Sequence, residues 1–113
     1  MFESSIFLKD INNYNFNFKK MLKKTNTILL INCNNININI KSKINRIILQ
    51  KCKNINISIG NVISGIEIFK STGVTIKIYD NKKINCLELF NSNIIINKLN
   101  YQLINENSLI KFK

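Results

Sequence analysis

Apolar and polar residues alternate along most of this chain, and the alternating segments repeat about every twenty residues. Three copies begin at Ile28, Ile47 and Ile66, and a more divergent fourth copy runs from Leu87 to Leu99. Apolar residues recur at every second position within a copy, which is the period of a strand and not of a helix. We therefore predict an all-β fold, a right-handed parallel β-helix (β-solenoid) with about 19–21 residues per coil.

Equivalent positions of the copies predict which side chains face the core. Two of the four residues in the column Leu29, Ile48, Glu67 and Glu88 are charged, so this column should face solvent. Successive side chains of a strand point to opposite faces, so the columns directly before and after it should face inward. The expected inward columns are Ile28/Ile47/Ile66/Leu87, Leu30/Leu49/Ile68/Leu89, Ile36/Ile55/Val74, Ile38/Ile57/Ile76, Ile40/Ile59/Ile78 and Ile44/Ile63/Ile84. Small residues form a further column of Cys33, Cys52, Ser71 and Ser92 at the corner of each coil.

The length of 113 residues predicts a single domain, 1–113. We divide it into an N-terminal cap segment (1–26), repeated coils (27–99) and C-terminal edge strands (100–113). Edge strands at solenoid ends invite pairing with another chain, so self-association through Leu103–Phe112 is expected.

Composition narrows the chemistry further. The net charge is +11, and the chain contains no His, no closely spaced pair of carboxylates and no glycine-rich phosphate loop, so we predict no enzymatic activity and no cofactor. Cys33, Cys52 and Cys86 are expected to be reduced, buried packing residues, because their odd number and spacing fit neither a disulfide framework nor a metal site. Asn suits the corners, because it tolerates left-handed backbone.

No signal peptide is evident at the N-terminus, and the longest apolar run extends only from Ile28 to Ile31. A cytoplasmic protein that does not enter a membrane is therefore expected.

Nucleic acid is the generic partner for so basic a chain. Base stacking would need aromatic residues among the basic ones. Tyr14, Phe16 and Phe18 precede Lys19 and Lys20, but their alternation with Asn indicates an amphipathic strand capping the first coil. We expect no specific nucleic-acid binding. The basic group Lys19, Lys20, Lys23 and Lys24 is interpreted as a solvated face.

Several motifs resemble the C-terminal domain of the cyclase-associated protein family, the β-helix that binds actin monomers. They are Lys41-Ser-Lys-Ile-Asn45, Gln50-Lys-Cys-Lys53, Asn61-Val-Ile-Ser-Gly-Ile-Glu-Ile68 and the alternating strand that follows Lys70. The order and spacing of these elements agree with the family, and weaker similarity extends from about Phe7 to Ser108. The resemblance implies a cytoskeleton-associated protein that binds monomeric actin, with the ADP-loaded form favoured, and regulates filament turnover by sequestering monomers.

Some features of the family are not matched. Ser42 replaces a corner glycine, and the helical domain, Pro-rich linker and WASP-homology segment of longer members are not in this sequence. The family continues past the position of Lys113 with a hairpin that exchanges strands between subunits. Homodimer formation and nucleotide exchange on actin depend on that hairpin, so monomer binding is the main expectation.

The resemblance and the charge together give the candidate site. Lys41, Lys43 and Asn45 would bind actin from a solenoid corner, Arg46, Lys51 and Lys53 would extend the basic face, and Asn61 and Ser64 would add polar contacts. Two alternatives remain open. One is a regulator of a GTPase, like tubulin cofactor C, for which Arg46 would be the only candidate arginine finger, although it lacks that family's neighbouring Gln and His. The other is a basic scaffold that binds a different acidic partner.

Overall fold

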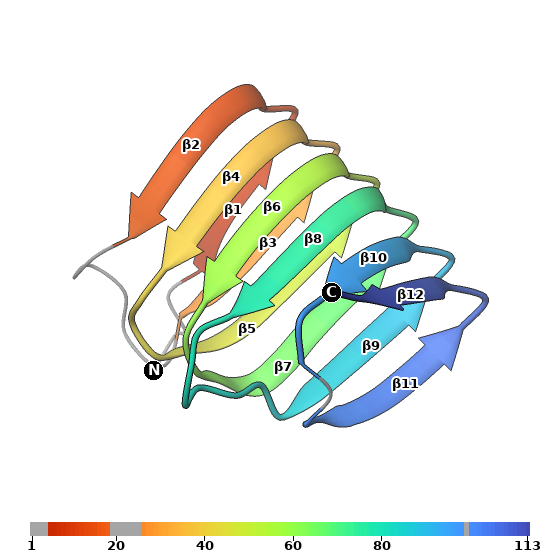
Figure 1. Cartoon of the computed structure of the whole chain (residues 1–113). Helices are drawn as coiled ribbons and strands as arrows, with labels where there is room; N and C mark the ends of the chain where they lie inside the picture. The colour runs from red at the N-terminus through yellow and green to blue at the C-terminus, as the bar shows by residue number, and fades with distance from the viewer. Residues whose placement is uncertain (1–4, 19–25, 99) are drawn as a thin grey trace.

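The computed structural model describes residues 5–18, 26–98 and 100–113, and every regular element in these residues is a β-strand. Successive strands alternate between two six-stranded parallel sheets (Figure 1). Sheet A contains β1 (Ser5–Lys9), β3 (Thr27–Ile31), β5 (Ile44–Gln50), β7 (Val62–Phe69), β9 (Cys86–Phe90) and β11 (Gln102–Glu106). Sheet B contains β2 (Asn12–Phe18), β4 (Asn34–Ile40), β6 (Lys53–Ile59), β8 (Thr72–Ile78), β10 (Asn93–Ile96) and β12 (Leu109–Phe112). The predicted parallel β-solenoid is confirmed.

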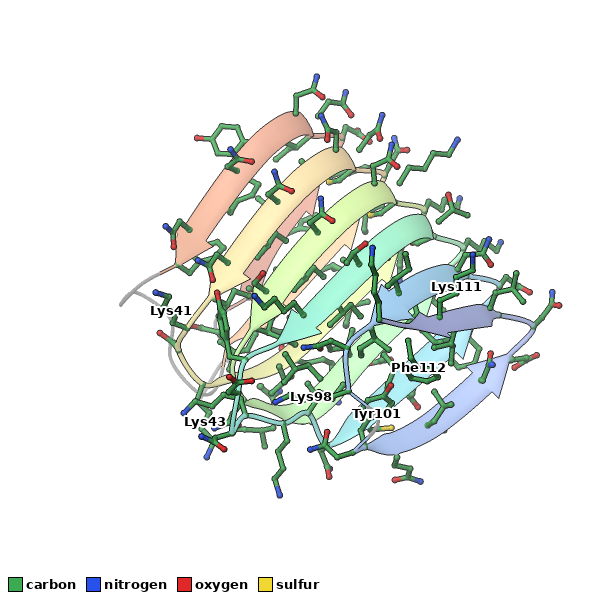
Figure 2. All side chains as sticks on the ribbon, in the orientation of Figure 1. Lys41, Lys43, Lys98, Tyr101, Lys111 and Phe112 are labelled. Carbon is green, nitrogen blue, oxygen red and sulfur yellow. The ribbon has the colours of Figure 1, made fainter. Side chains whose placement is uncertain are left out.

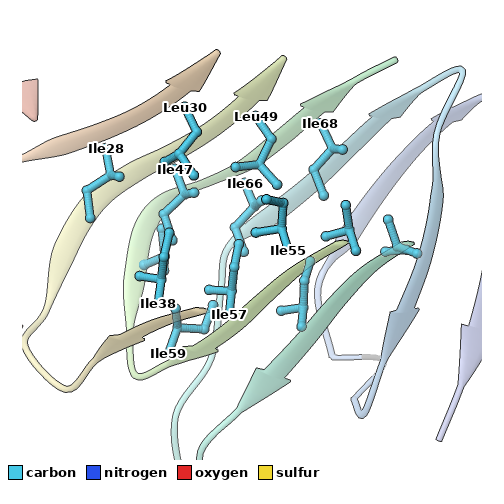
Figure 3. Close-up of a cluster of buried hydrophobic side chains, with 14 of the residues drawn as sticks. Ile28, Leu30, Ile38, Ile47, Leu49, Ile55, Ile57, Ile59, Ile66 and Ile68 are labelled. Atoms are coloured by element: carbon cyan, nitrogen blue, oxygen red, sulfur yellow. The ribbon is translucent and has the colours of Figure 1, made fainter. Parts of the chain in front are cut away.

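The core lies between the two sheets and consists of stacked aliphatic side chains (Figure 3). In sheet A, Ile28 pairs with Ile47, and Ile47 with Ile66, as the sequence alignment of the copies predicted. In sheet B, Ile57 lies between Ile38 and Ile76. All of these side chains are buried, because each coil covers the apolar face of its neighbour.

One inward position was predicted wrongly. Ile63 was expected beside Ile44, but Val62 pairs with Ile44 and is buried, whereas Ile63 is 41% exposed. The cause is a β-bulge, since β7 has one more residue than β5 between this pair and the pair Arg46–Gly65. Gly65 has a φ of 136°, and a Cβ there would overlap the carbonyl oxygen of Cys86. The extra residue shifts the side-chain alternation by one, which turns Ile63 toward solvent.

The column of small residues is buried at one corner of the solenoid, as predicted, and Ser108 extends it by one coil. Each member forms hydrogen bonds that satisfy the backbone at the bend. Ser71 Oγ accepts a bond from the backbone N–H of Cys52 (3.0 Å) and donates one to the carbonyl of Phe69 (2.9 Å). Cys52 Sγ donates to the carbonyl of Gln50 (3.3 Å). We refer to the bends at 10–11, 32–33, 51–52, 70–71, 91–92 and 107–108 as the Cys/Ser edge.

Replacing Ser71 tests this arrangement. Ser71→Ala removes the acceptor of the Cys52 N–H in a fully buried position, so we expect a loss of about 1–3 kcal/mol in the free energy of unfolding. Ser71→Cys should cost clearly less, because Cys already occupies the column at Cys33 and Cys52 and sulfur is a weak acceptor. Urea unfolding measures both values. Equal losses for the two variants would show that the hydrogen bond does not matter.

Asparagine shapes both the corners and the outer surface of sheet B. Of the ten described non-glycine residues with positive φ, seven are Asn, in agreement with the expected role at corners. On the outer face of sheet B, Asn37 Nδ2 donates to Asn15 Oδ1 (2.8 Å), and Asn56 Nδ2 donates to Asn37 Oδ1 (2.9 Å). These amide hydrogen bonds connect neighbouring coils on the surface. In the core, the inward columns of apolar side chains connect the same coils.

Parts of the N-terminal segment also form strands. β1 and β2 pair in register with β3 and β4, so residues 5–18 add a strand to each sheet. Phe16 and Phe18 are partly buried against the core, whereas Tyr14 is 55% exposed. The basic group Lys19, Lys20, Lys23 and Lys24, as well as Leu99, lies outside the described residues. In the described ranges, no helix is long and apolar enough to cross a membrane.

Candidate functional site

The eight candidate residues are divided between two opposite edges of the solenoid. Lys41 and Lys43 lie in the bend that leads from sheet B to sheet A. Lys51 and Lys53 lie at the Cys/Ser edge, beyond the other end of β5. A strand advances about 3.3 Å per residue, so Lys43 and Lys51 are roughly 25 Å apart. The structure therefore does not bring the five basic residues from Lys41 to Lys53 together into one cluster.

Other lysines gather around Lys41 and Lys43. The following bends on the same side, 60–61, 79–85 and 97–98, bring lysines from distant parts of the sequence to this edge (Figure 2). We call the group Lys41, Lys43, Lys82, Lys83 and Lys98 the lysine edge. At Gly60, an added Cβ would lie 3.3 Å from the carbonyl oxygen of Lys41 and 3.9 Å from the Lys82 side chain, which shows how closely these bends stack.

Hydrogen bonds fix the backbone of the lysine edge. Lys98 Nζ donates to the carbonyl of Tyr79 (2.7 Å), and the Tyr79 hydroxyl donates to Asn39 Oδ1. The side chain of Asn97 bonds both the N–H and the carbonyl of Ile78, at 2.8 and 3.0 Å. Lys41, Lys43, Lys82 and Lys83 are exposed on this braced framework. Their ammonium groups are therefore presented from a defined backbone and not from a long loop.

The three candidate polar residues lie next to the lysine edge. Ser64 Oγ donates to Asn45 Oδ1 (2.6 Å), which links β5 to β7 on the outer face of sheet A. Asn61 Oδ1 accepts a hydrogen bond from the backbone N–H of Lys83 (2.9 Å). All three side chains are half-buried. They position neighbouring strands and bends and still present part of their surface to a partner.

Arg46 is engaged in an ion pair. Its Nε lies 3.2 Å from Glu67 Oε2, and the two side chains are 44% and 22% exposed. Glu67 in turn neighbours Glu88 in the register of β7 and β9. The position of Glu67 agrees with the prediction that the column of Glu67 and Glu88 faces outward. The ion pair also means that Arg46 adds less free positive charge to a basic face than its sequence position suggested.

Comparison with models of known protein families shows which family the chain belongs to. The family model described as the adenylate cyclase associated (CAP) C terminal matches residues 9–101. This chain belongs to the CAP C-terminal family. A search of curated proteins found no match. The match includes all eight candidate residues and the lysine edge, and family membership is consistent with actin binding in general.

Sequence reasoning missed three of the five lysines of the lysine edge in this CAP C-terminal domain. Lys82, Lys83 and Lys98 are far from Lys41 in sequence, and no motif marked them as candidates. The repeat itself contained the signal, because the bends that follow the second strand of each coil must stack along one edge. Conversely, Lys51 and Lys53 belong to the motif that resembles the family but lie at the other edge. There, Lys51 has a φ of 52° and borders a shallow hollow lined by Asp10, Asn32 and Lys53.

Cys86 differs from its predicted role. It is a free thiol, like Cys33 and Cys52, but it is half-exposed at the start of β9 and is not a buried corner residue. It lies outside the small-residue column and lines a hollow with Arg46, Glu67 and Glu88. Partial burial raises the pKa of the Cys86 thiol, and the negative charges of Glu88 and then Glu67 raise it further. In the described residues, no group of three or more His, Cys, Asp or Glu side chains could hold a metal.

The raised pKa of Cys86 makes a testable prediction. In the folded protein, iodoacetamide should label Cys86 before Cys33 and Cys52, which are buried, but slowly at neutral pH, because the thiolate is the reactive form. The rate should continue to increase as the pH rises above the ordinary thiol pKa. Glu88→Gln should accelerate labelling at a fixed pH by lowering the thiol pKa. Mass spectrometry of peptides measures each site. Labelling of Cys33 at the same rate would contradict the assigned burial.

Proposed function

We propose that this CAP C-terminal domain binds monomeric actin through the lysine edge and the adjoining outer surface of β5 and β7. The observation that carries the proposal is the family match over residues 9–101, since actin binding is the activity associated with this family. In this proposal, Lys41 and Lys43 are the main contacts, Asn45, Asn61 and Ser64 contribute polar contacts, and Arg46 contacts actin beside its ion pair with Glu67. Lys51 and Lys53, at the opposite edge, act at long range through the net charge.

Electrostatics supports the same partner. Actin is acidic, and a domain with a net charge of +11 and a basic edge would be attracted to it over a distance of about a Debye length. Acidic residues near the edge are few, and Asp80 is the one within the 79–85 bend. Charge complementarity of this kind increases the rate of encounter and selects the orientation of docking.

In the cell, the proposed role is to sequester actin monomers in the cytoplasm, with a preference for the ADP-loaded form. Bound monomers would be withheld from filament ends until they are released. Promotion of nucleotide exchange on the bound monomer is a further part of the proposal.

A steady-state pelleting assay tests sequestration directly. Actin is polymerised in the presence of increasing amounts of the domain, and the filaments are removed by centrifugation. Sequestration predicts that unpolymerised actin increases in proportion to the added domain until the domain is saturated. An unchanged supernatant at a large molar excess of the domain would rule out sequestration.

A second assay separates sequestration from nucleotide exchange. Release of a fluorescent ATP analogue from actin monomers is followed with and without the domain. Faster release than from actin alone would support exchange activity, whereas unchanged or slower release would limit the function to sequestration. The same actin preparation serves for both assays, so the two activities are directly comparable.

A further inference from the structure

The exposed lysines of the lysine edge come from two bends that are not adjacent. They lie in the bends 41–43 and 79–85, and the bend between these two, 60–61, contains only Gly and Asn. The two groups of ammonium groups are therefore held together across a coil that supplies no charge of its own. Their relative position depends on what fixes the bend 79–85, which is the longest of the three.

Small residues in the intervening coil let the two bends approach closely. An added Cβ at Gly60 would lie 3.3 Å from the carbonyl oxygen of Lys41 and 3.9 Å from the side chain of Lys82. Ser58, which pairs with Asn39 of the neighbouring strand, is also small. This coil therefore leaves room for a long side chain of the next coil to pass over it.

Tyr79 spans the intervening coil. It follows the last residue of β8, and its hydroxyl donates a hydrogen bond to Asn39 Oδ1 on β4. In sheet B, β6 lies between these two strands (Figure 1). Both side chains are half-buried. Tyr79 therefore connects two coils that are not neighbours, whereas the hydrogen bonds of the sheet connect adjacent coils only.

The backbone of Tyr79 is fixed as well. Its N–H donates to the carbonyl of Ile59 (2.9 Å), and its own carbonyl accepts a bond from Lys98 Nζ (2.7 Å). The same carbonyl accepts a bond from the N–H of Lys82 (3.1 Å), which closes a turn at the start of the bend. Tyr79 is thus the anchor of the bend 79–85, and Lys82 is only one turn away from it.

We propose that Tyr79 is a positioning residue of the actin-binding site. Its bond to Asn39 holds the lysines of the bend 79–85 beside those of the bend 41–43. This inference rests on the proposed function, because it concerns how the lysine edge meets an acidic partner. An ammonium group that is already in place loses less conformational freedom on binding than one carried by a loose bend. Tyr79 therefore raises the affinity for actin through the lysines, without a charge of its own.

Backbone ¹⁵N relaxation of the protein tests the positioning role without actin. In Tyr79→Phe, which removes only the hydroxyl, the order parameters of the Lys82 and Lys83 amides should fall from about 0.85 toward about 0.6. Asn39→Ala should produce the same loss, whereas Asn39→Asp should keep the wild-type order, because a carboxylate also accepts the bond. The matched control Asn37→Ala removes two amide bonds on the same face of β4 and should leave the bend unchanged. Unchanged order in Tyr79→Phe would overturn the proposal.

A double-mutant cycle with actin shows whether Tyr79 acts through the lysines. Tyr79→Phe should weaken binding of monomeric actin by about three- to tenfold. In the background Lys82→Gln/Lys83→Gln, this substitution should have no further effect. In the background Lys51→Gln/Lys53→Gln, which removes equal charge at the Cys/Ser edge, it should keep its full effect. Equal effects in the two backgrounds would overturn the proposal, because a general loss of structure weakens binding in both.

The two experiments distinguish this inference from the proposed function. If the wild type binds no actin, the proposed function fails together with the role of Tyr79 in binding, and the relaxation data still decide whether Tyr79 positions the bend. If Tyr79→Phe binds actin as tightly as the wild type, the proposed function stands and the role of Tyr79 is overturned. Far-UV circular dichroism confirms that each variant is folded.

Discussion

The double variant Lys41→Glu/Lys43→Glu is expected to weaken binding of monomeric actin by roughly 10- to 100-fold, or about 1.4–2.8 kcal/mol. Both side chains are exposed on the short bend between β4 and β5, and the reversal places negative charge where an acidic partner would dock. The affinity is measured by titrating the variant into fluorescently labelled actin monomers. Exposed substitutions of this kind typically change the free energy of unfolding by less than about 0.5 kcal/mol, so the far-UV β signal should be unchanged.

The structure provides a matched control for this experiment. Lys51→Glu/Lys53→Glu makes the same change in net charge at the Cys/Ser edge, roughly 25 Å away across β5. We expect this control to reduce affinity by no more than about threefold, through weaker long-range attraction. Equal losses for the two double variants would show that only the net charge matters. A larger loss for the control would place the binding surface at the Cys/Ser edge.

The largest expected effect on stability follows from Ile57→Ala. Ile57 is 1% exposed, and it is stacked between Ile38 and Ile76 in the middle of sheet B. Because a coil covers Ile57 on each side, the neighbouring side chains cannot easily move into the space that the truncated side chain leaves. The resulting cavity should reduce the free energy of unfolding by about 2–5 kcal/mol. Because domains of this size are typically stable by about 5–15 kcal/mol, the midpoint of urea unfolding should fall substantially.

Two comparison variants separate the stacking effect from general sensitivity to substitution. Ser58→Ala changes the adjacent outward position and should shift the free energy of unfolding by less than about 0.5 kcal/mol. Ile110→Ala changes an inward position of the last coil, where the side chain is only partly buried, and should cost less than Ile57→Ala. Similar losses at Ile57 and Ile110 would contradict the assignment of Ile57 to a continuous stack.

The columns of the core could be predicted from the sequence because they follow from two periods, one of two residues and one near twenty. The alignment of Cys33, Cys52, Ser71 and Ser92 was enough to place Ile28, Ile47 and Ile66 one above another, and the register agrees. The same reasoning failed at Ile63, since a one-residue bulge changes the alternation without changing the composition of the segment. Cys86 was misplaced for a related reason, because it was treated like the other cysteines although it lies outside their column.

The candidate site was harder to predict than the fold. Residues that are close in sequence, such as Lys43 and Lys51, are separated by the whole length of β5, whereas Lys41 and Lys82 are drawn together by stacked bends. In a solenoid, therefore, the members of a charge cluster have to be identified from positions that stack in successive coils and not from their closeness in the sequence. The ion pair of Arg46 with Glu67 depends on the bulge at Gly65, which sets the register of β7 beside β5.

The most direct test of the central claim is a titration of the wild-type domain into fluorescently labelled, ADP-loaded actin monomers at about 0.15 M salt. Near-physiological ionic strength is essential, because at low salt a protein with a net charge of +11 binds many acidic surfaces. Actin binding through the lysine edge predicts a saturable signal in the micromolar range or tighter, with weaker binding to ATP-loaded actin. A signal that does not saturate, or that is equally strong with an unrelated acidic protein, would contradict a specific complex with actin.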